Sequence, residues 1–231
     1  MSQVILNVLC EGQTEDRFAN HVLKPYLKNF GIVVKITILL TNKKKNKRGG
    51  MLSYTRAKND LELLVKQHLK RNYETHYYTT MFDLYALPDD FPGYAEAKEL
   101  ADSYARINKL EERFAADMCC RNFIPYIQLH EFEALVFCGL QYLLVDYPGM
   151  DKQVENLQQI VGQYGNNTEM INDSPQTAPS KRIEKEFETH HHYNKPKSGE
   201  YVTGRVGIEA LKGRCPHFKE WIDQLENLAK P

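Results

Sequence analysis

Two spacings of apolar residues alternate along the first 145 positions of the chain. Runs of apolar or β-branched residues predict buried strands over about residues 3–10, 32–40, 77–82 and 123–129. Apolar residues at helical spacing predict helices over about residues 14–28, 55–71, 94–119 and 131–144. Strands that alternate with helices in this order favour a parallel sheet with right-handed crossovers. We therefore expect an α/β fold whose sheet has about four mainly parallel strands, flanked by helices.

The last third of the chain has a different pattern. Helical spacing returns in two segments, at about residues 151–161 and 216–229. Residues 162–180 are polar and rich in Asn, Pro and Gly. Basic turns are expected around three residues that follow, Lys181, Lys195 and Lys197. We therefore divide the chain into an α/β core, residues 1–145, and a helical elaboration, residues 146–231, which packs on the core in a single structural unit.

The composition limits the class of protein. The 231 residues are 42% hydrophobic, which suffices for one large core. Thirty basic and thirty acidic residues cancel, so any affinity for nucleic acid has to come from local patches. The sequence contains neither an apolar run of membrane-spanning length nor a recognisable secretory leader, so we expect no membrane segment. Five cysteines without CxxC spacing argue against a disulfide framework or structural zinc and indicate a reducing cytoplasm.

An acidic residue ends the first predicted strand. The apolar run stops at Glu11 and Gly12, and glycine permits a tight turn there. Glu15 falls in the first turn of the next helix, which Thr14 can cap. Two close carboxylates at the carboxyl edge of a sheet repel unless a cation lies between them, and oxygen ligands suit Mg²⁺ or Mn²⁺. A structural alternative stays open, because Glu11 could instead cap the helix or pair with an arginine.

Acids also end two further predicted strands. Asp83 follows the third strand, and Glu131 and Glu133 follow the fourth. The carboxyl ends of parallel strands share one edge, so these residues should converge with Glu11 although they are distant in sequence. We expect the carboxylates of Glu11, Asp83 and at least one of the other two to lie within about 10 Å of one another, since metal–oxygen bonds are only about 2.1 Å long.

A basic segment follows the second predicted strand. It has five positive charges in six positions and is followed by a glycine pair, a composition typical of a mobile loop. Its basic residues are Lys43, Lys44, Lys45, Lys47 and Arg48. In a parallel sheet this loop emerges at the same edge as Glu11. The cations could contact nucleic-acid phosphates, or the loop could simply be solvated.

These motifs resemble the Toprim domain, which occurs in topoisomerases, primases and the overcoming-lysogenization-defect nucleases. More closely, the chain resembles a Toprim-like family of unassigned function in prokaryotic genomes, often encoded beside ABC-type or AAA ATPases in defence loci. The resemblance rests on five stretches that span nearly the whole chain: Cys10–Phe18, Met81–Tyr85 with Leu87–Gly93, Tyr126–Ala134, Ala178–Ile183 and Cys215–Trp221. It implies a Toprim or Rossmann-like sheet.

The resemblance also implies roles for individual residues. Glu11 matches the Toprim glutamate, a metal ligand or general acid/base, and Glu15 matches the second acid of the nuclease motif. Asp83 matches the first acid of the Toprim DxD motif, but Tyr85 occupies the position of the second. Either a single metal binds, or another acid replaces the missing ligand, the candidates being Asp89, Asp90, Glu131 and Glu133. Two lysines are candidates for the cation that stabilises a pentavalent phosphate, Lys181 and Lys195.

Two functions follow from these features. The first is a Mg²⁺- or Mn²⁺-dependent nuclease that cuts DNA or RNA and acts with an ATPase partner in phage defence, as the resemblance implies. The second is a catalytically impaired, Toprim-like binding subunit that partners an ABC or AAA ATPase, which Tyr85 favours. A third interpretation, a phosphate-binding α/β enzyme, is weaker because the sequence contains no GxxxxGK[ST] loop.

Overall fold

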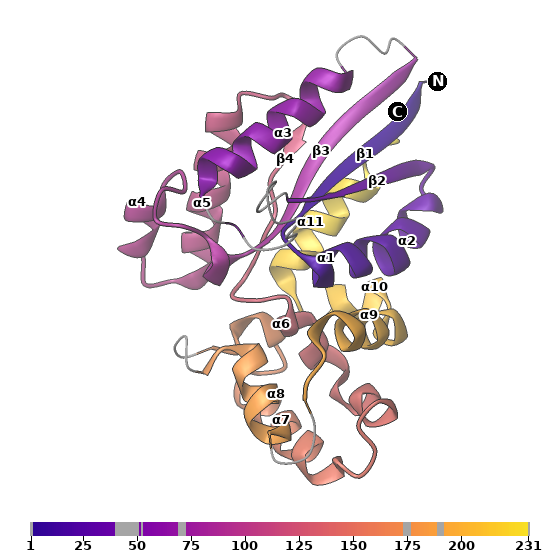
Figure 1. Cartoon of the computed structure of the whole chain (residues 1–231), viewed down its shortest axis with the longest axis vertical. Helices are drawn as coiled ribbons and strands as arrows, with labels where there is room; N and C mark the ends of the chain where they lie inside the picture. Colours follow the sequence, from indigo (N-terminus) through magenta and orange to yellow (C-terminus); the bar gives the residue numbers. More distant parts are fainter. Residues whose placement is uncertain are drawn as a thin grey trace.

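A parallel sheet forms the centre of the molecule (Figure 1). The computed structural model describes residues 2–39, 51, 53–68, 73–172, 177–188 and 192–230. Within these residues the strands are β1 (Gln3–Cys10), β2 (Ile32–Ile38), β3 (Glu74–Asp83), β4 (Phe123–Ile124) and β5 (Ile127–Gln128). Their order is β2-β1-β3-β4, with β5 also paired to β3, and every pairing is parallel. The α/β class expected from the sequence is confirmed.

The sheet has an apolar core on each face, because successive side chains of a strand point to opposite sides. In β1, Leu6 and Val8 belong to one core and Leu9 to the other. The first core contains apolar residues of α1 (Gln13–Phe18), the π-helical turn η1 (Ala19–Leu23), α2 (Lys24–Lys28) and the C-terminal helices. The second contains those of α3 (Tyr54–His68), α4 (Tyr94–Lys98) and α5 (Ser103–Met118). Both faces of the parallel sheet are therefore covered.

The fourth strand and the helix before it differ from the prediction. The expected strand 123–129 consists of two short pieces separated at Pro125, which cannot donate to a sheet. The Thr80 hydroxyl of β3 bridges this break, since it donates to the Tyr126 carbonyl and accepts from the Tyr126 N–H, at 2.9 and 3.0 Å. The expected helix 94–119 is also divided, into α4 and α5, because the Asp102 side chain caps the start of α5.

The C-terminal helices pack on one another and on the sheet. They are α6 (Glu133–Val136), α7 (Asp151–Gln163), α8 (Pro179–Phe187), α9 (Lys195–Val206), α10 (Ile208–Lys212) and α11 (Pro216–Glu226). Three 3₁₀ segments complete the described elements, η2 (Leu84–Ala86), η3 (Phe137–Val145) and η4 (Thr168–Met170). On α11, the Trp221 ring stacks on Tyr126 at 4.1 Å and its Nε1 donates to Thr79 Oγ1 of β3 at 2.9 Å. This contact joins α11 directly to the sheet.

Two further expectations were wrong for this region. The apolar helix expected over 131–144 is a short α-helix followed by η3, with non-helical dihedral angles at Gly139. A Cβ at Gly139 would lie 2.3 Å from Val206 Cγ2, so close packing against α9 requires glycine there. The basic turns were also wrong, because Lys181 lies in α8, and Lys195 and Lys197 lie in α9. No helix in the described parts of the chain is long and apolar enough to span a membrane.

Helix α9 contacts the core through a glycine, and this contact generates a prediction. A Cβ at Gly199 would lie 2.8 Å from Phe132 Cε1 and 3.1 Å from Thr14 Cγ2. We expect Gly199→Ala to lower the free energy of unfolding by about 1–3 kcal/mol, because the buried Phe132 ring would have to shift. Chemical denaturation measures this change.

Gly204→Ala is the matched control on the same helix. The nearest atom to its added Cβ is Val22 Cγ2 at 3.6 Å, an ordinary contact, so the substitution should stabilise the exposed helix position by up to about 1 kcal/mol. Equal effects of the two substitutions would contradict the close contact at Gly199.

Candidate functional site

The carboxyl ends of β1 and β3 lie side by side at the point where the chain connections diverge. The segment after β1 leads to β2, which lies on one side of β1 in the sheet. The segment after β2 leads to β3, which lies on the other side of β1. Ligands of open α/β folds bind at such switch points. Glu11 directly follows β1 and Asp83 is the last residue of β3. The two are hydrogen-bonded, because the Asp83 N–H donates to Glu11 Oε2 at 3.1 Å.

Glu15 joins this pair from the start of α1. The helix begins at Gln13 with Gly12 as its N-cap, so the expected cap at Thr14 was wrong. The reason is that Glu15 reaches back and accepts a hydrogen bond from the Gly12 N–H at 2.8 Å. This bond holds Glu15 under the helix start, where it is 6% exposed.

The last two acids come from the turn between β5 and α6. His130 adopts left-handed backbone dihedral angles (φ 66°) in this turn. Glu131 Oε2 accepts a hydrogen bond from the Ser180 N–H of α8 at 2.9 Å. Glu133, the first residue of α6, is 3% exposed, and its Oε1 lies 4.0 Å from Lys195 Nζ of α9. Helices of the C-terminal third thus contribute to the environment of both acids.

These residues form one electrostatic unit, the acidic cluster, which consists of Glu11, Glu15, Asp83, Glu131 and Glu133. Burial raises the pKa of Asp83 well above its usual range, and repulsion from all four glutamates raises it further. Burial likewise raises the pKa of Glu11, of Glu15 and of Glu133 to about 7 in each case. The Lys195 charge lowers the pKa of Glu15 and of Glu133, but it does not cancel the increase that burial causes.

Oxygen atoms of the acidic cluster could accept a hard divalent cation. Asp83 Oδ1 and Glu133 Oε1 are buried and have no hydrogen-bond partner among the described residues. A set of carboxylate oxygens is the ligand chemistry that Mg²⁺ and Mn²⁺ prefer. In the present side-chain arrangement, no three His, Cys, Asp or Glu residues of the described chain are grouped so that they could hold a metal ion. Three of the acids instead accept hydrogen bonds from backbone N–H groups, Glu11, Glu15 and Glu131.

The other predicted residues have distinct positions. Lys181 is half exposed and pairs with Glu184 at 2.7 Å, outside the acidic cluster. Two of the four candidate substitutes for the expected second acid have partners outside the acidic cluster: Asp90 accepts a hydrogen bond from the Tyr54 N–H at the start of α3, and Asp89 bonds to the Tyr94 hydroxyl. The basic residues 43–48 lie outside the described part of the chain.

Tyr85, where the Toprim resemblance leads us to expect a second acid, lies beside His130. Its ring lies 5.4 Å from the His130 ring, and its N–H donates to the His130 carbonyl at 3.2 Å. Burial and the Arg106 charge lower the pKa of His130 to about 4, so this imidazole is neutral at pH 7. Tyr85 therefore covers a neutral histidine beside the acidic cluster.

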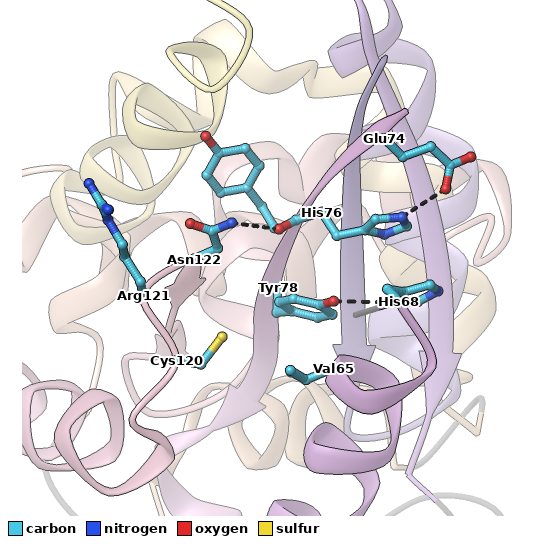
Figure 2. Close-up of a pocket in the computed structure, with 9 residues that line it drawn as sticks. Val65, His68, Glu74, His76, Tyr78, Cys120, Arg121 and Asn122 are labelled. Carbon is cyan, nitrogen blue, oxygen red and sulfur yellow. Dashed lines mark hydrogen bonds and ion pairs between the residues drawn. The ribbon is translucent and has the colours of Figure 1, made fainter. Parts of the chain in front are cut away.

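A cavity of about 770 Å³ at the opposite end of β3 contains residues that the sequence analysis did not select. Figure 2 shows His68 and His76 with parallel rings, whose centroids are 4.0 Å apart. His76 Nε2 lies 2.8 Å from Glu74 Oε2, and Tyr78 Oη lies 3.4 Å from His68 Nδ1. No spacing in the sequence joins His68 to His76, because they come from α3 and β3 and meet only in the folded chain.

The raised pKa values of the acidic cluster generate a prediction of pH dependence. A carboxyl group whose pKa rises from about 4.5 to about 7 on folding binds more protons in the folded state across that interval. The free energy of unfolding should therefore fall as pH increases from about 4.5 to about 7. Above pH 7, the contribution of these carboxyl groups to that free energy should be constant. Glu133→Gln removes one such group, so above pH 7 the variant should be more stable than wild type by about 1–3 kcal/mol.

Urea denaturation of the chelator-treated protein at several pH values measures this difference. Glu99→Gln, at an exposed position of the described chain, is the control and should leave the pH dependence of the free energy of unfolding unchanged. A difference between wild type and Glu133→Gln that does not depend on pH would contradict the raised pKa.

One family model matches residues 10–226, which include the whole acidic cluster and the helices that surround it. The family is described as "Domain of unknown function (DUF4276)". Comparisons with curated proteins and with solved structures gave no match. Because the matched range covers nearly the entire chain, the protein belongs to the DUF4276 family.

Proposed function

We propose that the protein is a metal-dependent nuclease related to the Toprim domain, which hydrolyses phosphodiester bonds in DNA or RNA. The observation that supports this proposal is the acidic cluster around Asp83 at the carboxyl ends of β1 and β3. The five acids are buried or partly buried, and Lys195 is the lysine that pairs with one of them, so the cluster carries a net negative charge when ionised. Bound divalent cations would compensate this charge.

Each residue of the site has a proposed task. Glu11 and Asp83 would hold the metal, and Glu15, Glu131 and Glu133 would complete or support its ligand set. Mg²⁺ or Mn²⁺, when bound, would neutralise charge on the scissile phosphate and lower the pKa of a coordinated water. Lys195, whose ammonium lies 4.0 Å from Glu133 and is partly exposed, would contact the phosphate oxygens during hydrolysis. Lys181, which pairs with Glu184 outside the cluster, is the alternative candidate for this contact.

The wider setting of this activity follows from the Toprim resemblance. The basic residues 43–48 would draw the polyanion toward the acidic edge of the sheet, since nucleic acid needs a local patch on a chain without net charge. An ABC- or AAA-type ATPase would act as the partner, and the pair would defend the cell against phage. We place the protein in the cytoplasm, because its five cysteines, which are free thiols, suit a reducing compartment.

Tyr85 favours a second candidate, a binding subunit that retains the fold without the metal chemistry. The tyrosine stands where a second acid of the motif is expected, and it packs against His130. Asp89 and Asp90 bond to Tyr94 and to the start of α3, outside the acidic cluster. In this case the chain would bind an ATPase partner but would not cleave nucleic acid.

Metal binding distinguishes the two candidates. Mg²⁺ or Mn²⁺ should raise the melting temperature of the wild-type protein as its concentration increases, because a ligand of the folded state stabilises it by mass action. Glu11→Gln should reduce this response and lower Mg²⁺-dependent cleavage of DNA or RNA by roughly 100-fold or more, while leaving the fold intact. Differential scanning fluorimetry and cleavage of labelled single- and double-stranded substrates provide the two measurements.

The controls separate metal binding from salt and from charge loss. KCl at matched ionic strength should not reproduce the Mg²⁺ response, and Glu99→Gln should behave as wild type in both assays. Full cleavage activity in Glu11→Gln would rule out the proposed site. The absence of any metal response in the wild type would favour the binding subunit.

Substitution of the basic segment tests the proposed nucleic-acid contact. Changing Lys43, Lys44, Lys45, Lys47 and Arg48 to Ser should weaken binding and flatten its salt dependence by about one unit of log–log slope for each lost phosphate contact. Titrations by fluorescence anisotropy at several KCl concentrations measure the slope. A matched variant loses five exposed lysines elsewhere, Lys24, Lys28, Lys35, Lys152 and Lys230, and should retain the wild-type slope. Equal slopes in wild type and the basic-segment variant would show that the segment does not contact phosphate.

A further inference from the structure

Two cysteines that are far apart in sequence lie together in the C-terminal part of the molecule. Cys138 belongs to η3, and Cys215 directly precedes α11. Their sulfur atoms are 3.6 Å apart although the residues are separated by 77 positions. Both are free thiols. A disulfide bond between them would require the sulfurs to approach from 3.6 Å to about 2.0 Å.

The Thr168 hydroxyl completes a triangle with the two thiols. Its Oγ1 lies 3.2 Å from Cys138 Sγ and 3.1 Å from Cys215 Sγ. Thr168 is itself fully buried, and it stands at the start of η4. A hydroxyl in this position can donate a hydrogen bond to either sulfur and can therefore stabilise a thiolate; the buried Glu169 carboxylate acts on both thiols in the opposite direction.

The two thiols differ in their access to solvent. Cys138 lines a cavity of about 610 Å³ together with Gln141, Asn166 and Arg214, and it is 7% exposed. Cys215 has no exposed surface. The Arg214 side chain lies at the same cavity and donates from Nη1 to the Cys138 carbonyl at 2.9 Å. A small oxidant that enters the cavity therefore meets Cys138 first.

The same neighbours make the two sulfurs unequal in acidity. The hydrogen bond with Cys215 lowers the pKa of the Cys138 thiol, and Thr168 and the Arg214 charge act in the same direction, against burial. Burial raises the pKa of Cys215 well above its usual range. A thiolate is the nucleophilic form of cysteine, so the accessible sulfur is also the more reactive one.

We propose that Cys138 and Cys215 form a reversible thiol–disulfide site, in which Cys138 reacts with hydrogen peroxide and Cys215 resolves the product. This site is separate from the acidic cluster and does not depend on the proposed nuclease activity. Oxidation would link η3 covalently to the beginning of α11, the helix that contacts the sheet through Trp221.

The chemistry proceeds in two balanced steps. The Cys138 thiolate attacks one peroxide oxygen, so that an S–O bond forms, the O–O bond breaks and the departing hydroxide leaves as water after protonation. The Cys215 sulfur, after losing its proton, then attacks the Cys138 sulfenic acid; the S–S bond forms, the S–O bond breaks and a second water leaves. Two thiols and one peroxide thus give one disulfide and two waters. The thiols are oxidised and the peroxide oxygens are reduced.

The test uses the full chain with its more accessible thiols removed, Cys119→Ser/Cys120→Ser, so that only Cys10, Cys138 and Cys215 remain. Hydrogen peroxide should cause loss of the mass of two hydrogen atoms from the folded protein, and dithiothreitol should restore it. Peptide mapping should show Cys138 linked to Cys215. Cys10, which is buried without a nearby thiol partner among the described residues, should remain open to alkylation after unfolding and serves as the internal control.

Single substitutions in this background assign the two roles. With Cys215→Ser, the oxidised Cys138 should accumulate as a sulfenic acid that dimedone captures. With Cys138→Ser, Cys215 should stay reduced. The proposal is overturned if Cys138 and Cys215, after peroxide treatment of the folded protein, are both still alkylated once the protein is unfolded, or if Cys10 oxidises as fast as they do. The measurement on the background protein needs no substitution at the buried pair, so it stands even if a single variant fails to fold.

Discussion

Parallel pairing of β1 with both β2 and β3 is the constraint on which the site depends. Because all paired strands run in one direction, their carboxyl ends open on the same edge, and the connections diverge there. The pairing of Cys10 with Met81 places Glu11 next to the end of β3, where its carboxylate accepts from the Asp83 N–H. The contact between the two acids is thus a direct result of strand register.

Burial of several acids at one edge has an electrostatic cost that the fold reduces only in part. Backbone N–H groups bond to Glu11 and Glu15, and these bonds favour the ionised forms. Burial outweighs this help at Glu11, and burial together with repulsion from Glu11 outweighs it at Glu15, so the pKa of each rises to about 7. A core without a ligand-binding role gains nothing from such an arrangement, which is why the cluster carries the functional proposal.

The C-terminal helices complete this edge of the sheet. Helix α8 donates the Ser180 N–H to Glu131, and α9 brings Lys195 to Glu133. The position of α9 depends on its close approach to Phe132 at Gly199. The helical third is therefore part of the site as well as of the core, and the same packing brings Cys138 close to Cys215.

The sequence by itself determined the elements that local periodicity encodes. Apolar runs located β1, β2 and β3, and the acids after them identified Glu11 and Asp83, because residues at strand ends share an edge in any parallel sheet. Tertiary structure decided the contacts between distant segments. Three contacts have no local pattern in the sequence, because they arise from the packing of helices on one another and on the sheet: Lys195 with Glu133, His68 with His76, and Cys138 with Cys215.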